Sequence, residues 1–259
     1  MYFLLFLQIL NQLILTMFRS VFFIIFILIQ FSAYSQNSDS ESRESYPFWV
    51  NITTKGGILT SNATNGNFED DQNVYFGYMN PGYNIGGQIG ANWGGGFGFA
   101  FEGLFAQSSQ KYEITQGGVK YEKSVYYRTF DKFILLRSIA EKGSYMEIGL
   151  KLTKVIKAWE ENNIDTPFGI YKSYFSSKER FGIIFGFGVN VFFTPVYSLN
   201  IGSRVSYTIS DIMDGEHYLI EDGVYQKNYN SYAMTNPFML EITLCMNFHI
   251  GDLEKKKDD

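Results

Sequence analysis

The sequence is poor in cysteine, histidine, positive charge and long apolar runs. Its single cysteine, Cys245, excludes an intramolecular disulfide, and we expect it to be a small side chain in a strand. Beyond residue 35 no stretch approaches the ~20 consecutive apolar residues that a membrane-spanning helix needs. The net charge of −5, with no basic stripe, argues against nucleic acid as a partner.

The one largely apolar segment lies at the N-terminus. Read from Met17, the chain shows Arg19, then the apolar Val21–Phe31, then the small residues around Ala33. This is the layout of a secretory signal peptide, so we predict one over residues 1–35, with the part before Met17 arising from a misassigned start. An uncleaved anchor helix and a long functional leader remain alternatives. No cysteine lies near the cleavage site, which excludes a lipid-modified N-terminal cysteine.

Alternation of apolar with small or polar residues is abundant. Over residues 181–193 the odd positions carry only Phe, Ile or Val, while the even positions include three glycines, Asn190 and Phe192. Successive side chains of a strand point to opposite faces, so one face is apolar and the other is small and mostly polar. Similar segments predict eight strands: Tyr46–Leu59, Pro81–Trp93, Gly95–Gln107, Glu122–Arg137, Ser144–Lys157, Arg180–Thr194, Tyr197–Ser210 and Pro237–Ile250.

The connections between these strands alternate between long and short. The long ones are 60–80, 108–121, 158–179 and 211–236, and the short ones lie at 93–95, 140–143 and 194–196. Long extracellular loops and short periplasmic turns are typical of outer-membrane barrels. We therefore predict an all-β fold, an eight-stranded antiparallel up-and-down transmembrane β-barrel. It would occupy residues 46–250, after a disordered lead-in over 36–45 and before a charged periplasmic tail over 251–259.

The alternation also assigns faces. Phe97, Phe99, Phe101 and Phe105 are predicted to face lipid, with Glu102 inside. The segment 122–137 does not alternate cleanly through Phe133-Ile134-Leu135-Leu136. Either a β-bulge or a locally apolar lumen would explain this segment.

An eight-stranded barrel has an interior just wide enough for side chains to fill it. Because burying an isolated charge is costly, inward charges should be paired. We predict a luminal ion-pair network that plugs the barrel, with Arg204 beside Glu241 as the favoured pair and a gate or proton path as the alternative. Its members would be Glu102, Glu147, Lys151, Arg204 and Glu241.

Signals for catalysis, metals and cofactors are weak. His217 lies near Ser210, Asp211 and Asp214, an arrangement that a lipid-modifying enzyme could use, but no motif spacing supports it. The acidic group Glu69–Asp71 lacks the spacing of a calcium loop. We therefore predict no catalytic residues, no metal and no cofactor.

The long connections are rich in tyrosine, which favours recognition surfaces because it combines contact area with a polar group. Packing within the loops, or an aromatic girdle at the membrane interface, is the alternative role. The candidate binding surface consists of Tyr171, Tyr174, Tyr218, Tyr225, Tyr229 and Tyr232.

The chain resembles the outer-membrane β-barrel domain family, the porin-like, OmpA-type eight-stranded barrels of Gram-negative bacteria. The resemblance covers about residues 46–250 and rests on three segments: Phe133-Ile134-Leu135-Leu136-Arg137, Tyr145-Met146-Glu147-Ile148-Gly149-Leu150, and Leu240 with the closing Asn247-Phe248-His249-Ile250. Such barrels often end on an aromatic residue, whereas here a charged tail follows Phe248.

The resemblance implies insertion into the outer membrane by the barrel assembly machinery. The expected location is therefore the outer membrane, with loops extracellular and both termini periplasmic. Expected partners are outer-membrane lipid and lipopolysaccharide, the assembly machinery and an extracellular or envelope protein. The expected role is structural or partner-binding, through four long loops. A lipid-modifying enzyme and a soluble periplasmic barrel of lipocalin type are the alternatives.

Overall fold

The structure is a computed structural model that describes residues 48–77, 80–93, 96–116, 118–140, 144–162, 178–194, 196–213 and 233–251. The predicted signal peptide and lead-in lie outside these residues, as does the predicted tail over 251–259 except for Gly251, which ends the last strand. Within the described part of the chain, no helix is long and apolar enough to cross a membrane.

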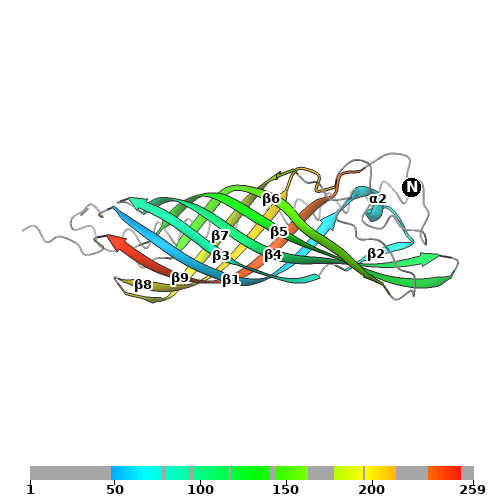
Figure 1. Cartoon of the computed structure of the whole chain (residues 1–259), viewed down its shortest axis with the longest axis horizontal. Coiled ribbons are helices and arrows are strands. Elements are labelled where there is room, and N and C mark those ends of the chain that lie inside the picture. The colour runs from blue at the N-terminus through cyan, green and yellow to red at the C-terminus, as the bar shows by residue number, and fades with distance from the viewer. Residues whose placement is uncertain are drawn as a thin grey trace, which may run out of the picture. The chain divides into compact units, whose positions relative to one another are not determined.

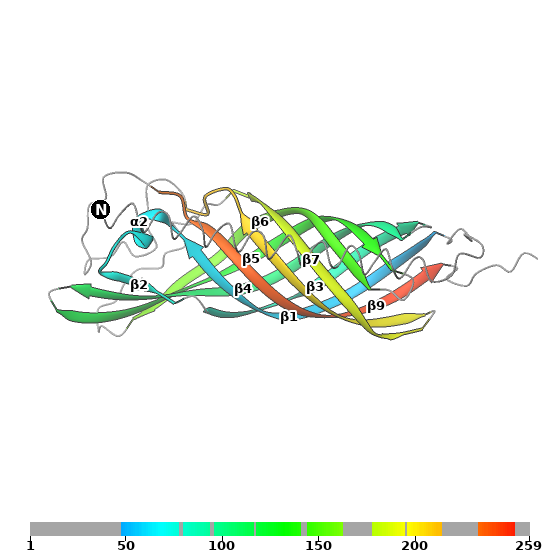
Figure 2. The same ribbon diagram turned by 180° about the vertical axis from the view of Figure 1, so that it is seen from behind.

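Eight long antiparallel strands form a closed barrel (Figures 1 and 2). The order around the barrel is β3-β1-β9-β8-β7-β6-β5-β4, and pairing of β4 with β3 closes the ring. This confirms the predicted all-β, eight-stranded fold. The strands are β1 (Trp49–Thr64), β3 (Asn80–Trp93), β4 (Phe97–Gln116), β5 (Val119–Ile139), β6 (Tyr145–Asn162), β7 (Arg180–Phe193), β8 (Tyr197–Thr208) and β9 (Asn236–Gly251).

A ninth, short strand lies outside the ring order. β2 (Val74–Phe76) follows the one-turn helix α2 (Gly66–Glu69) and pairs with β4 beyond the end of β3. The predicted loop over 60–80 therefore contains the end of β1, a helical turn and a strand that extends the barrel wall.

The first barrel strand begins, and the last one ends, at the same edge of the barrel. β1 pairs with β9 from Trp49 opposite Gly251 to Thr64 opposite Asn236, so the first and last strands of the barrel are neighbours in the ring. The short connections β3–β4, β5–β6 and β7–β8 lie at this same edge, which we call the short-turn end. A closed ring leaves no long strand with an unpaired edge, which removes the usual site of edge-to-edge aggregation.

The exterior of the ring is apolar, as the alternation predicts. Phe97, Phe99, Phe101 and Phe105 are exposed, whereas Glu102 between them is buried. β9 repeats the pattern, with exposed Phe238, Leu240, Ile242, Leu244, Met246, Phe248 and Ile250. We call this outward set of exposed apolar side chains the apolar belt.

The ambiguous segment of β5 has a locally apolar lumen. Phe133 and Leu135 point inward and are buried, while Ile134 and Leu136 are exposed outside. The inward pair packs with Ala100, Leu104 and Ile184 in one buried cluster. The β-bulge of this strand pair lies elsewhere, between Arg128 and Thr129, so strict alternation holds through the whole segment.

Two further predictions about the strands differ from the structure. Residues 108–121, predicted as a long loop, continue β4 and β5 as a regular hairpin that closes with Gln116 opposite Val119. A two-residue hairpin turn needs positive φ, which Gly118 supplies at +80°. Phe192, predicted to face inward, is 48% exposed, because a bulge between Asn190 and Phe192 shifts the register of β7 against β8 and resets the alternation.

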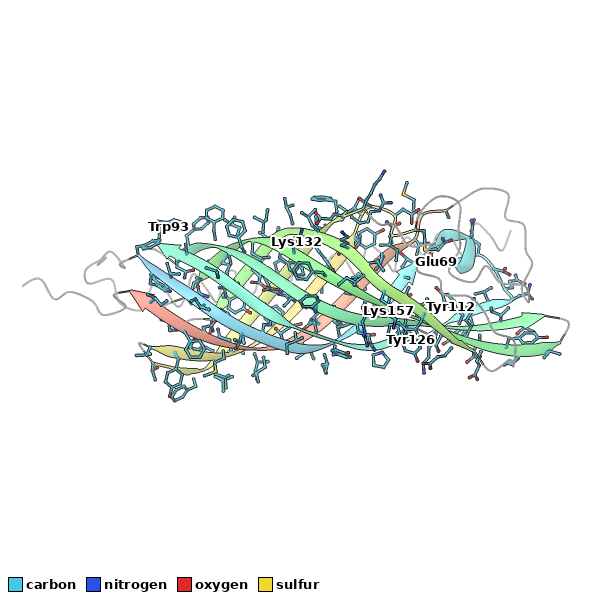
Figure 3. The ribbon with its side chains drawn as sticks, in the orientation of Figure 1. Glu69, Trp93, Tyr112, Tyr126, Lys132 and Lys157 are labelled. Atoms are coloured by element: carbon cyan, nitrogen blue, oxygen red, sulfur yellow. The ribbon has the colours of Figure 1, made fainter. Side chains whose placement is uncertain are left out.

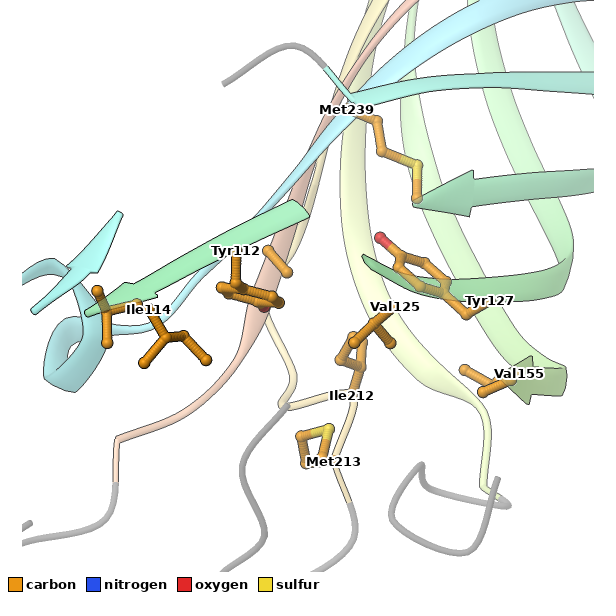
Figure 4. Packing of buried hydrophobic residues seen from close by; sticks show 11 residues of the cluster. Tyr112, Ile114, Val125, Tyr127, Val155, Ile212, Met213 and Met239 are labelled. Carbon is orange, nitrogen blue, oxygen red and sulfur yellow. The ribbon is translucent and has the colours of Figure 1, made fainter. Parts of the chain in front are cut away.

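The extended hairpin carries the reverse of the belt pattern. Tyr112 and Ile114 on β4, and Val125 and Tyr127 on β5, point inward and are buried. They pack with other apolar side chains into a cluster inside this end of the barrel (Figure 4). The outward positions between them carry polar and charged side chains: Lys111, Glu113, Lys120 and Glu122, all exposed.

Candidate functional site: the charged network in the lumen

Arg204 lies at the centre of a charged network inside the barrel. Its guanidinium forms a bidentate ion pair with Glu102, in which Nη2 lies 2.8 Å from Oε2 and Nη1 contacts Oε1. Its Nε donates to Oε1 of Glu147 at 2.5 Å. β8, which carries Arg204, stands opposite β4, which carries Glu102, so the first contact crosses the lumen. Bidentate Arg–carboxylate pairs are among the stronger ionic hydrogen bonds of proteins.

Further charges complete the network. Lys55 Nζ lies 2.7 Å from Oε2 of Glu102, and Arg137 Nε lies 3.6 Å from Oε2 of Glu147. Lys151 Nζ pairs with Oδ2 of Asp131 at 3.1 Å. Glu241 accepts a hydrogen bond of 3.0 Å from Asn84. The buried basic members, Lys55, Arg137, Lys151 and Arg204, thus face an equal number of buried acids, Glu102, Asp131, Glu147 and Glu241.

The network differs from the predicted one in its pairing. Arg204 and Glu241 are register neighbours on β8 and β9, yet the ion pairs of Arg204 go to Glu102 and Glu147 instead. Lys151, another predicted member, forms its ion pair with Asp131, which lies outside the predicted set.

Lys55, Asp131 and Arg137 escaped the sequence reasoning. The signal for Lys55 was its parity with Asn51 and Thr53 on the small, polar face of β1. Asp131 and Arg137 point to the same inward face as Phe133. The run of four apolar residues over 133–136 hid the alternation of β5, so this face could not be identified.

An aromatic ring and two glycines support the network toward the short-turn end. Tyr145 lies opposite Gly188 in the β6–β7 register, and a Cβ on Gly188 would come within 2.3 Å of its ring. A Cβ on Gly202 would lie 2.9 Å from the Tyr145 hydroxyl. The Arg137 guanidinium lies 4.1 Å from the ring centroid. The glycines therefore provide the space in which the ring lies across the lumen.

Toward the hairpin end, a segment after β8 covers the network. Ile212 and Met213 are buried in the apolar cluster of Figure 4 together with Tyr112 and Val125. Oδ1 of Asp211 accepts hydrogen bonds from the backbone N–H groups of Met213 and Thr235, which holds the segment in place. The lumen is thus filled in two layers, an ionic layer and an apolar layer.

Other candidate residues lie elsewhere. His249 is half-buried near the short-turn end, where Nε2 lies 3.1 Å from the hydroxyl of Ser198. His217 and all six tyrosines of the predicted binding surface, Tyr171, Tyr174, Tyr218, Tyr225, Tyr229 and Tyr232, fall outside the described residues. Among the residues that the structure describes, no group of three His, Cys, Asp or Glu side chains could hold a metal ion.

Comparison with known proteins gives structural likeness only. No family model matches the chain, and no curated protein matches it. Solved structures with a similar strand arrangement include the outer membrane protein OprG from Pseudomonas aeruginosa, at 9% identity and a TM-score of 0.44, covering 82% of this chain and 100% of that one. Neisserial surface protein A follows at 11% identity and 0.35, covering 79% and 97%. The Yersinia pestis protein Ail, in complex with the heparin analogue sucrose octasulfate, gives 13% and 0.34, covering 79% and 99%. At these values the likeness assigns neither family nor activity to this chain. The fold is established by the strand pairing of the chain itself.

Proposed function

We propose that the chain is an integral outer-membrane β-barrel with a sealed lumen, and that its role is structural or partner-binding through the surfaces at its hairpin end. The observation that carries this proposal is the reversal of hydrophobicity along β4 and β5. The proposed partners are outer-membrane lipid and lipopolysaccharide around the belt, the barrel assembly machinery during insertion, and an extracellular or envelope protein.

The reversal supports a membrane boundary across the strands. Along β4, Phe101 and Phe105 are exposed outside while Glu102 is buried inside. Farther along the same strand, Tyr112 is buried inside while Lys111 is exposed outside. An apolar exterior suits hydrocarbon, and an apolar interior with a polar exterior suits water. A soluble barrel would show the second pattern over its whole length.

The filled lumen supports a role other than transport. Eight strands enclose little more than their own side chains. Here the space is occupied by the Arg204 network and, beyond it, by the apolar cluster that includes Ile212. Ions would have to displace buried, paired charges in order to pass.

We expect the purified, folded barrel to be non-conducting in planar lipid bilayers. The folded state would first be verified by a band that shifts on boiling in a denaturing gel. Each addition of folded protein should leave the baseline current flat at applied voltages of either sign, whereas an open general porin added as the positive control should give steps. Discrete, reproducible conductance steps from the folded protein would contradict a sealed lumen.

We expect the extended hairpin to face the outside of the cell. In a Cys245→Ser background, Lys120→Cys on the hairpin should react with a membrane-impermeant maleimide on intact cells, because Lys120 is exposed. The matched variant Ala140→Cys, at the exposed β5–β6 turn, should react only after the outer membrane is permeabilised. Labelling of Ala140→Cys alone on intact cells would reverse the proposed orientation.

A further inference from the structure

The outward-facing basic residues of the barrel are confined to one side. Among the residues that the structure describes, every lysine or arginine that a strand directs outward and exposes lies on β4, β5 or β6. These are Lys111, Lys120, Arg128, Lys132, Lys154 and Lys157. The remaining strands carry their buried basic side chains inward, as Lys55 and Arg204 show. The exterior charge of the barrel is therefore asymmetric.

Four of these residues lie at the edge of the apolar belt nearest the hairpin, interspersed with the outward apolar side chains Phe130 and Ile156. On β5 the outward positions pass from Leu136 and Ile134 to Lys132, and on β6 they pass from Leu150 and Leu152 to Lys154. The register sets Lys132 opposite Leu152, Phe130 opposite Lys154 and Arg128 opposite Lys157, so the change occurs side by side on both strands. Figure 3 shows Trp93 at the short-turn end, with Lys132 and then Lys157 closer to the hairpin.

An indole organises the part of this surface nearest the hairpin. Arg128 Cζ lies 5.2 Å from the ring centroid of Trp159, and Lys157 Nζ lies 5.5 Å from it. Tyr126 stacks on the same indole, with ring centroids 5.2 Å apart. Trp and Tyr side chains are typical of the boundary between hydrocarbon and headgroups. Two cations are thus held at the level where headgroups would lie.

Acidic residues compensate only part of this charge. Lys132 pairs with Glu179 at 2.5 Å, and the hydrogen bond and charge of Lys132, followed by the charge of Lys154, lower the pKa of Glu179. Glu161 lies on β6 beyond Trp159, opposite Ser124. Among the side chains that the structure describes, none forms an ion pair with Arg128, Lys154 or Lys157.

We infer that Arg128, Lys132, Lys154 and Lys157 form a docking site for a phosphate-bearing lipid headgroup of the outer leaflet. This inference rests on the proposed membrane location. Lysine stems can lie along the apolar belt while their ammonium groups reach the headgroup level. Phosphate oxygens accept several ionic hydrogen bonds, and the guanidinium of Arg128 can offer two in parallel. The lipid would therefore bind preferentially on the β5–β6 side.

The test compares two variants that each remove two exterior lysine charges. The first is Lys154→Gln/Lys157→Gln, within the proposed site. The control is Lys111→Gln/Lys120→Gln, on the hairpin. Folded protein in neutral dodecyl maltoside micelles would be titrated with bis-phosphorylated lipid A, and the bound fraction read by native mass spectrometry. Each basic side chain near an anionic surface adds to the binding affinity for that surface. The first variant should therefore bind lipid A about 30-fold more weakly than wild type, and the control less than about twofold more weakly.

Two further probes identify the ligand chemistry. Lipid A from which both phosphates have been removed should bind wild type no better than it binds the first variant, and inorganic pyrophosphate should not compete. Equal losses in the two variants, or undiminished binding by the first, would overturn the site. Full competition by pyrophosphate would assign it to a free anion instead. Because only protein with a heat-shifted band enters the titration, absence of that band would count against the proposed membrane barrel and not against the lipid site.

Discussion

Replacing Arg204 by methionine is expected to lower the free energy of unfolding by about 3–5 kcal/mol. The substitution keeps much of the side-chain volume but removes the contacts with both Glu102 and Glu147. Glu102 would keep Lys55 at 2.7 Å, but Glu147 would retain only Arg137 at 3.6 Å, in a lumen where both carboxylates are buried. The measurement is urea unfolding of the folded barrel in micelles at pH 7, followed by tryptophan fluorescence.

The control for this prediction is Lys132→Met. It breaks the Lys132–Glu179 pair, whose side chains are 48% and 40% exposed, and exposed pairs contribute less than about 1 kcal/mol. Adding Glu147→Gln to Arg204→Met should recover part of the loss, because the added substitution removes an uncompensated buried charge. If Arg204→Met proved as mild as Lys132→Met, the network would not be holding the barrel together.

The substitution Gly188→Ala is expected to lower the free energy of unfolding by about 1–3 kcal/mol, the usual cost of overpacking. The new Cβ would lie 2.3 Å from Cε1 and 2.5 Å from Cζ of Tyr145. The ring has little room to retreat, because the Arg137 guanidinium lies against it and its hydroxyl is close to Gly202. The same unfolding measurement applies.

A second glycine provides the matched control. Gly56→Ala on β1 meets only the backbone oxygen of Asn84, at 3.8 Å, so it should change stability by less than about 0.5 kcal/mol. In the double variant Gly188→Ala/Tyr145→Ala the two losses should fall short of additivity, because the clash disappears with the ring. Strict additivity would show that the strain at Gly188 does not involve Tyr145.

The reversal along β4 and β5 shows where sequence reasoning stopped. Residues 108–121 are polar enough to resemble a loop, yet Tyr112 and Ile114 keep the period of two that a strand requires. What changed was which face is apolar. A search for strands whose outward face is apolar misses residues 108–121, because their apolar face points inward. The period of two, taken without regard to which face is apolar, would have extended both strands.

Side-chain partners inside the lumen show a deeper limit. From sequence, Arg204 could be paired only with a residue on an adjacent strand, and Glu241 met that condition. The ring places β8 opposite β4, so a long arginine side chain reaches Glu102 across the barrel. No local pattern encodes that distance, because it depends on the stagger of all eight strands.

The sequence by itself determined the number of barrel strands, the outward apolar belt and the inward position of five luminal charges, because strand alternation is a local property that can be read from each segment alone. Only the tertiary structure decided which charges meet, where the strands leave the belt and that the exterior lysines gather on one side. Closing the ring sets the pairing, because it brings Arg204 and Glu102 together although they are neighbours neither in the chain nor in the sheet. The extent and register of the adjacent strands β4, β5 and β6 set the two exterior features.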